Sequence, residues 1–218
     1  MAQACRARGL KTVAVSAGYI APQARIEFFR HMDAANIDLK GFTDGFYKTL
    51  CTGKLAPVLE TLEYLKHETQ VWFEITTLLI PGANDSPHEI EAESRWVMER
   101  LGPDVPLHFT AFHPDWKMLD TPPTPPQTLR LARRIAIEAG LRYVYTGNIH
   151  DEAGQSTYCH ACGATLIGRN WYDLTAWNLT PDGRCADCGA PCAGVFDAAN
   201  GHWGSRRRSV KVQAFAES

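Results

Sequence analysis

Short apolar segments alternate with helix-like segments from residue 11 to about residue 150, and this alternation limits the fold more than any other feature of the sequence. The apolar segments are rich in β-branched and aromatic residues, and the first four are each followed by a segment of helical character. A strand–helix repeat of this kind is typical of a parallel α/β sheet. Five strands are predicted: Lys11–Ser16, Asn36–Lys40, Val71–Ile80, Leu107–Phe112 and Arg142–Thr146.

Two helices have clear boundary signals. Ser86 followed by Pro87 predicts a helix start, because serine caps a helix and proline suits its first position, and Gly102 predicts its end. A second helix is expected after Thr124, with Gly140 as its end.

Five strands do not close an eight-stranded barrel, so we expect an open, partial (β/α) TIM-like barrel. Residues 1–10 read as the end of a helix that leads into the first strand, so the barrel is predicted to lack its first strands and the chain to be truncated. Two domains are expected, a partial barrel at residues 1–152 and a small zinc-ribbon-like module with a tail at residues 153–218.

Four of the seven cysteines form two C-x-x-C-G motifs, with Cys159 and Cys162 in the first and Cys185 and Cys188 in the second. Two thiolates three residues apart can hold one ion from a tight turn, and the following glycine permits the positive φ that brings N–H groups close to sulfur. The four sulfurs predict a tetrahedral zinc site, since so small a module gains much of its stability from metal. Iron on the same four thiolates, or a redox dithiol from one pair, stays open.

The formal net charge of -2 argues against a general nucleic-acid surface, and we interpret the basic run at residues 205–211 as a solvated tail. The N-terminal residues are too polar for a signal sequence, and no stretch approaches the ~18 consecutive apolar residues of a spanning helix. An odd number of cysteines, four of them in metal-binding pairs, suits a reducing compartment. A cytoplasmic protein without a membrane partner is therefore expected.

Polar residues near the carboxyl ends of the strands are candidates for a ligand site, because parallel α/β sheets bind ligands there. Asp38 and Lys40 share one face of a strand and form either an ion pair, which spacing alone favours, or a site for a zwitterion. Glu74 and Thr76 share a face of the third strand, where a carboxylate needs a partner or a polar cavity. His113 follows the fourth strand and is either a ligand contact or, as its position alone favours, a loop histidine.

Four segments and the cysteine ribbon carry a further signal. The segments are NIDLKGFTDGFYKTLCTGKLAPVLETLEYL, ITTLLIPGANDSPHEI, PLHFTAFHPDWKMLDTPPTPPQTL and GLRYVYTGNIHD. They look like radical S-adenosylmethionine (SAM) enzymes related to pyruvate formate-lyase activases. Together with the ribbon they resemble the AmmeMemoRadiSam-type subgroup over essentially the whole chain.

The resemblance implies a partial barrel in which a [4Fe-4S] cluster donates an electron to SAM, and the resulting 5′-deoxyadenosyl radical abstracts a hydrogen atom from a substrate. In such activases an aspartate and a lysine of a DLK strand and a histidine after a later strand line the SAM site, and the matching residues are Asp38, Lys40 and His113. Their implied role is to hold the methionine carboxylate and ammonium by charge-assisted hydrogen bonds. The weaker matches to the SAM site are Ser16, Glu74 and Thr76.

The sequence departs from the resemblance at the cluster motif. C-x-x-x-C-x-x-C, whose three thiolates hold three irons and leave the fourth for SAM, does not occur in the 218 residues, and Ala17 stands where asparagine is expected. The ribbon cannot replace the motif, because its four thiolates saturate one ion. The prediction is therefore an inactive fragment of a radical SAM enzyme, with an unidentified substrate, small molecule or protein, and an unidentified electron donor. The alternative is a non-catalytic binding protein that carries a zinc ribbon.

Overall fold

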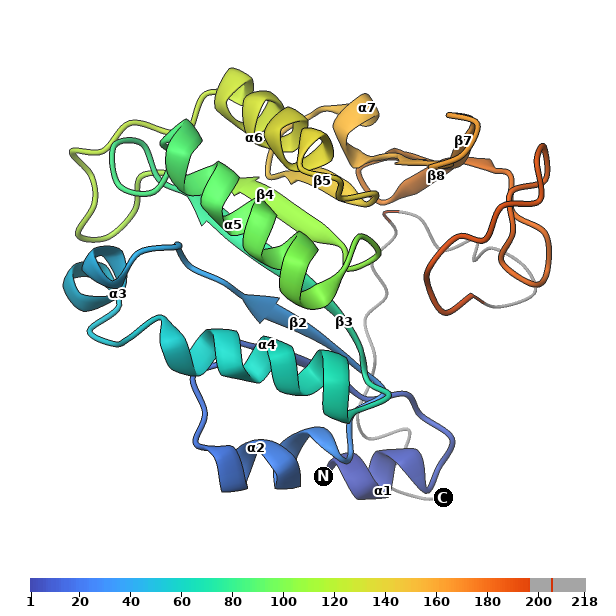
Figure 1. The fold of residues 1–218 in the computed structure, drawn as a ribbon, viewed down its shortest axis with the longest axis horizontal. Helices are drawn as coiled ribbons and strands as arrows, with labels where there is room; N and C mark the ends of the chain where they lie inside the picture. The colour runs from blue at the N-terminus through green and yellow to red at the C-terminus, as the bar shows by residue number, and fades with distance from the viewer. Residues whose placement is uncertain (197–204, 206–218) are drawn as a thin grey trace.

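The computed structural model describes residues 1–196 and 205, and its main feature is a five-stranded parallel sheet (Figure 1). The strands lie side by side in chain order and all pair in parallel, which confirms the predicted α/β class. The second strand begins and ends earlier than predicted, so Lys40 lies two residues beyond its end. The strands are β1 (Val13–Ser16), β2 (Ala34–Asp38), β3 (Trp72–Leu79), β4 (Leu107–Ala111) and β5 (Val144–Gly147).

Helices connect the strands, and Figure 1 shows α4, α5 and α6 on one face of the sheet. The start predicted for α5 is confirmed, because the Ser86 hydroxyl accepts a hydrogen bond from the Glu89 amide at 3.2 Å. Among the described helices, none has the length and apolar character needed to cross a membrane. The helices are α1 (Ala2–Arg6), α2 (Pro22–Phe29), α3 (Asp44–Leu50), α4 (Ala56–Glu68), α5 (Pro87–Leu101), α6 (Pro126–Glu138) and α7 (Glu152–Gln155).

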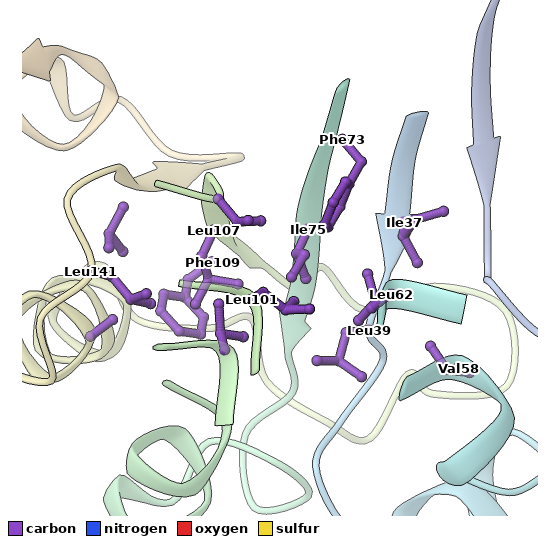
Figure 2. Packing of buried hydrophobic residues seen from close by; sticks show 14 of the residues in the cluster. Ile37, Leu39, Val58, Leu62, Phe73, Ile75, Leu101, Leu107, Phe109 and Leu141 are labelled. Carbon is purple, nitrogen blue, oxygen red and sulfur yellow. The ribbon is translucent and has the colours of Figure 1, made fainter. Parts of the chain in front are cut away.

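The main core lies between the sheet and these helices (Figure 2). Each strand sends alternate side chains into it, and on β3 these include Phe73, Ile75 and Leu79. Leu62 of α4 and Leu101 of α5 are fully buried against this side of the sheet. Burial of large apolar side chains is the main source of stability here, at about 1.5–3 kcal/mol for each one.

The other face of the sheet carries no helix in the described part of the chain, and its side chains are half-buried or exposed. On β1, which lies at one edge of the sheet, Val13 and Val15 are 63% and 76% exposed. On β2, β3 and β4 this open face is mainly polar. We call it the open face below.

The C-terminal part forms a separate antiparallel sheet of β6 (Thr157–Tyr158), β7 (Thr165–Asn170) and β8 (Asp173–Trp177), which confirms a zinc-ribbon-like module. Its small core contains Tyr143, which immediately precedes β5 of the large sheet. The Tyr143 hydroxyl accepts a hydrogen bond from the Ala193 amide at 3.0 Å and thereby ties the end of the module to the large sheet. Residues 206–211 of the basic run lie outside the described residues.

The carboxyl group of Glu93 on α5 is buried in the main core, and this residue is 2% exposed. It accepts a hydrogen bond from the Thr77 hydroxyl of β3. Burial raises the pKa of Glu93 to about 8, with a smaller contribution from the nearby charge of Glu89. The folded protein therefore keeps this carboxyl protonated at neutral pH, whereas the unfolded chain ionises it.

The free energy of unfolding is predicted to fall as the pH rises from about 5 to about 8. In this range the unfolded chain has lost the Glu93 proton and the folded protein has kept it, so each pH unit weakens folding by up to about 1.4 kcal/mol. Glu93→Gln keeps an acceptor for Thr77 and cannot ionise, so its stability should lose this slope. Urea unfolding at several pH values in this range measures the slope for the wild type and for Glu93→Gln. The exposed Glu99→Gln on the same helix is the control. Identical slopes in wild type and Glu93→Gln would exclude Glu93 as the titrating group.

Candidate functional site

The polar side chains of the open face form one continuous row across three strands. Asn36 lies beside Glu74 and Asp38 beside Thr76 in the β2–β3 register, and Thr76 lies beside His108 in the β3–β4 register. Neighbouring register positions share a face of a sheet, so the structure brings these side chains to the same side. Asp38, Glu74 and Thr76 were predicted to be site residues, and Asn36 and His108 are additions from the structure.

Asp38 and Lys40 form the ion pair that their spacing favours. The Lys40 ammonium lies 2.7 Å from the Asp38 carboxylate, and the two side chains are 40% and 28% exposed. The backbone of Lys40 is held on both sides, because its amide donates to the Tyr47 hydroxyl at 3.1 Å and its carbonyl accepts from the Asn84 side chain at 2.8 Å. The backbone of Lys40 is thus fixed, while both side chains of the pair are partly exposed to solvent.

Lys40 lines a cavity of about 590 Å³ at the carboxyl ends of β1, β2 and β3, which we call the first cavity. Most of its other walls are apolar or aromatic, including Tyr47 and Leu78, and Ala17 lines it without contributing a polar group. Thr52 in its wall has a φ of 51°, a left-handed backbone that costs a non-glycine residue roughly 1 kcal/mol or more. The cavity can therefore enclose an organic molecule that presents a charged group to Lys40.

Two predicted residues lie elsewhere. Ser16 is aligned with Ile37, so it faces the helix-covered side, and its hydroxyl accepts from the Gly18 amide at 3.1 Å. It therefore stabilises the turn after β1. His113 is exposed on the loop after β4 and does not line the first cavity.

Glu74 forms a second charged cluster on the open face. Its carboxylate accepts from His108 Nε2 at 2.8 Å and from Trp72 Nε1 at 3.3 Å. Burial alone would raise the pKa of Glu74, but the hydrogen bond from His108, with smaller contributions from other neighbours of the carboxylate, outweighs it and holds that pKa below its ordinary value. Beside it, the Thr76 hydroxyl accepts from the side-chain amide of Asn36 at 3.0 Å. Alternation in the β4 sequence LHFTA, with Leu107 and Phe109 in the core, is the signal that could have identified His108 in advance.

The four cysteines of the two motifs converge as predicted. Their sulfurs all lie within 4.8 Å of one another, with Cys159 and Cys188 separated by 3.6 Å and Cys162 and Cys185 by 3.7 Å. Four sulfurs at ~2.3 Å from one tetrahedral zinc ion stand about 3.8 Å apart, so the arrangement fits a single metal ion. Cys192 is buried in the module and does not belong to this group.

The two motifs have the same local geometry. Gly163 and Gly189 follow the second cysteine of each motif, with φ values of 77° and 75°. Their amides donate to the carbonyls of Cys159 and Cys185 at 2.9 Å and 2.8 Å, which closes each turn. A side chain at either glycine would strain this left-handed backbone, which is the physical reason for C-x-x-C-G.

No protein-family model matches the sequence. The uncharacterized protein MJ0808 of Methanocaldococcus jannaschii is 43% identical over 185 residues, which are 84% of this chain and 54% of that protein. The chain thus spans about half the length of this curated relative.

Two solved structures are similar in fold. A domain of a pyruvate-formate lyase-activating enzyme from Bacteroides vulgatus has a TM-score of 0.59 at 17% identity, over 67% of this chain and 87% of that one. A radical SAM methyltransferase from Sphaerobacter thermophilus has a TM-score of 0.53 at 14% identity, over 68% of this chain and 46% of that one. The chain therefore has a radical SAM-like fold, as its sequence predicted. The subgroup and the truncation stay predictions.

The purified protein is predicted to hold about one zinc ion per chain through the four cysteines. Cys185→Ser should lose this metal and unfold the ribbon, because three thiolates and a hydroxyl do not complete the site. Cys192→Ala removes a buried cysteine outside the group and should keep the metal. Elemental analysis of the three proteins measures this. Unchanged metal in Cys185→Ser, or iron with a rubredoxin-like spectrum, would contradict the assignment.

Proposed function

We propose that this chain is part of a radical SAM enzyme and that the first cavity binds SAM. The observation that carries the proposal is the Asp38–Lys40 pair at the carboxyl edge of a sheet with this fold, next to a cavity of about 590 Å³. The fold neighbours support the enzyme class by likeness alone. The substrate, small molecule or protein, and the electron donor are not assigned.

The charges of Asp38 and Lys40 are complementary to the methionine end of SAM. In the proposed complex the Lys40 ammonium holds the ligand carboxylate and the Asp38 carboxylate holds the ligand ammonium, which replaces one ion pair by two. The apolar walls of the first cavity exclude water from the rest of the ligand, which strengthens both contacts. In enzymes of this class, bound SAM supplies the radical that removes a hydrogen atom from the substrate.

The cysteines of this chain do not fit a [4Fe-4S] cluster with an open iron. Beyond the ribbon ligands, the remaining thiols are Cys5 on α1, Cys51 after α3 and the buried Cys192, and they lie on separate elements. Such a cluster needs three thiolates close together. We therefore propose that the cluster ligands lie outside these 218 residues, in keeping with a relative of which this chain matches only 54%.

The proposal also includes a domain boundary after residue 152, since the large sheet ends at Gly147 and the small one begins at Thr157. A cytoplasmic location belongs to it as well, because a reducing compartment preserves the ribbon thiolates. Neither structural comparison favours the alternative of a non-catalytic binding protein.

Lys40→Ala is predicted to weaken SAM binding by about tenfold or more, because it removes a charge-assisted contact. Its effect on unfolding should stay within about 1 kcal/mol, the usual contribution of a partly exposed ion pair. Equilibrium dialysis with labelled SAM and thermal melting give the two quantities. Lys66→Ala, at an exposed position on α4, is the matched control and should change neither. A large loss of melting temperature with unaltered SAM affinity would make the pair purely structural.

This chain alone is predicted neither to assemble a [4Fe-4S] cluster nor to cleave SAM. The test is anaerobic reconstitution with iron and sulfide, followed by electron paramagnetic resonance and a dithionite-driven assay for 5′-deoxyadenosine. When the residues of MJ0808 that lie outside the region matched by this chain are added, both the cluster resonance and 5′-deoxyadenosine should appear. Product from this chain by itself would overturn the assignment of the cluster ligands to residues outside it.

A further inference from the structure

A second cavity, of about 490 Å³, lies where the open face of the sheet meets the hairpin between β7 and β8. It shares no lining residue with the first cavity. Its size is within the ~300–1,000 Å³ range of small-molecule sites. The lining side chains used below are Glu74, His108 and Tyr145 from the large sheet and Arg169, Trp171 and Tyr172 from the ribbon.

His108 is the fixed hydrogen-bonding group of this cavity. Its Nε2 is engaged by Glu74 at 2.8 Å, and within the described part of the chain Nδ1 has no hydrogen-bond partner, so it is the ring nitrogen left for a ligand. The ring of Tyr145 stacks on it with 4.9 Å between centroids, and the Tyr145 hydroxyl bonds Thr157 at 2.9 Å. A carboxylate and a stacked ring thus fix the imidazole in one orientation before any ligand arrives.

The hairpin supplies two large aromatic side chains. Trp171 and Tyr172 occupy the two-residue turn between β7 and β8, and they are 50% and 75% exposed. Turns of this length favour small residues such as Asn-Gly, since they require positive φ. Trp171 has a φ of 53°, and Asn148, which also lines the cavity, has a φ of 59°. The turn therefore keeps the exposed Trp171 ring at the cavity against its own backbone preference, and the exposed Tyr172 ring follows it.

The charged side chains that line this cavity favour neither an anionic nor a cationic ligand. The lining contains one carboxylate, Glu74, and one guanidinium, Arg169, which are opposite in sign. Arg169 is held by the Gln155 carbonyl at 3.1 Å and the Thr157 hydroxyl at 2.8 Å, and its charge lies 5.7 Å from the Tyr145 ring centroid. The chemistry that remains is a hydrogen bond at His108 and stacking at the hairpin.

We propose that the second cavity binds a small uncharged molecule with an aromatic ring and a hydroxyl or N–H group, which donates to His108 while the ring packs against Trp171 and Tyr172. The polar group satisfies the remaining imidazole nitrogen, and the ring covers apolar surface that is now exposed to water. The site needs both parts of the chain, because the sheet supplies the acceptor and the ribbon supplies the aromatic wall. It does not depend on SAM binding.

The test uses the metal-loaded full chain labelled with 5-fluorotryptophan, with phenol as the probe and cyclohexanol as a probe of the same polar group without the aromatic ring. Fluorine NMR resonances of Trp171 and Trp116 are assigned with Trp171→Gly and Trp116→Gly. Trp116 is the matched control, because it is exposed, has a φ of 47° and does not line the cavity. Phenol is expected to shift the Trp171 resonance to saturation and to leave that of Trp116 in place, and cyclohexanol is expected to shift neither.

Two substitutions separate the contributions, and phenol affinity is followed by saturation-transfer NMR. Trp171→Gly suits the left-handed turn and removes one ring, so it should weaken phenol binding by about tenfold, whereas Trp116→Gly should not. His108→Gln should weaken it by a similar factor through loss of the oriented acceptor. Absence of a Trp171 shift in the wild-type protein, or equal shifts at Trp116 or with cyclohexanol, would overturn the proposal whether or not the variants fold.

Discussion

The arrangement of helices on one side of the parallel sheet determines most of what this molecule can do. Leu62 and Leu101 are buried against one face, and the strand side chains on that face are mainly apolar. The opposite face has to remain compatible with water, so it can carry Asp38, Glu74 and His108 without the desolvation cost that a fully buried charge would incur. Lys40 and Leu78 bring the first cavity next to this face, and Glu74, His108 and Tyr145 bring the second cavity onto it.

Features that depend on local sequence could be predicted, whereas features that depend on register could not. The Ser86 cap, the two glycine-closed cysteine turns and the Asp38–Lys40 pair each need only a few neighbouring residues, and the structure contains all of them. The Glu74–His108 pair joins residues 34 positions apart and depends on how β3 and β4 align. The side to which Ser16 points likewise depends on its alignment with β2, and the course of the loop after β4 decides where His113 lies.

The ribbon does more than bring four cysteines together, because its fold also places side chains next to the large sheet. Cys159 and Cys162 precede β7 directly, and β7 carries Arg169 to the open face. Tyr143 belongs to the core of the ribbon, although it sits immediately before β5. A module of this size gains much of its stability from a bound metal, so an ion at the four cysteines would also support the walls of the second cavity. Loss of the ion would therefore weaken the second cavity, although none of the four cysteines lines it.

The position of β1 at the edge of the sheet has a consequence for assembly. In the described part of the chain β1 has a single neighbouring strand, so its outer row of amide and carbonyl groups is left to water or to another strand. A further parallel strand at this edge would satisfy these groups and would also shelter Val13 and Val15, which are now in contact with solvent. The sheet is therefore extensible along β1, and a strand that docked there would gain both backbone hydrogen bonds and apolar contact from a single event.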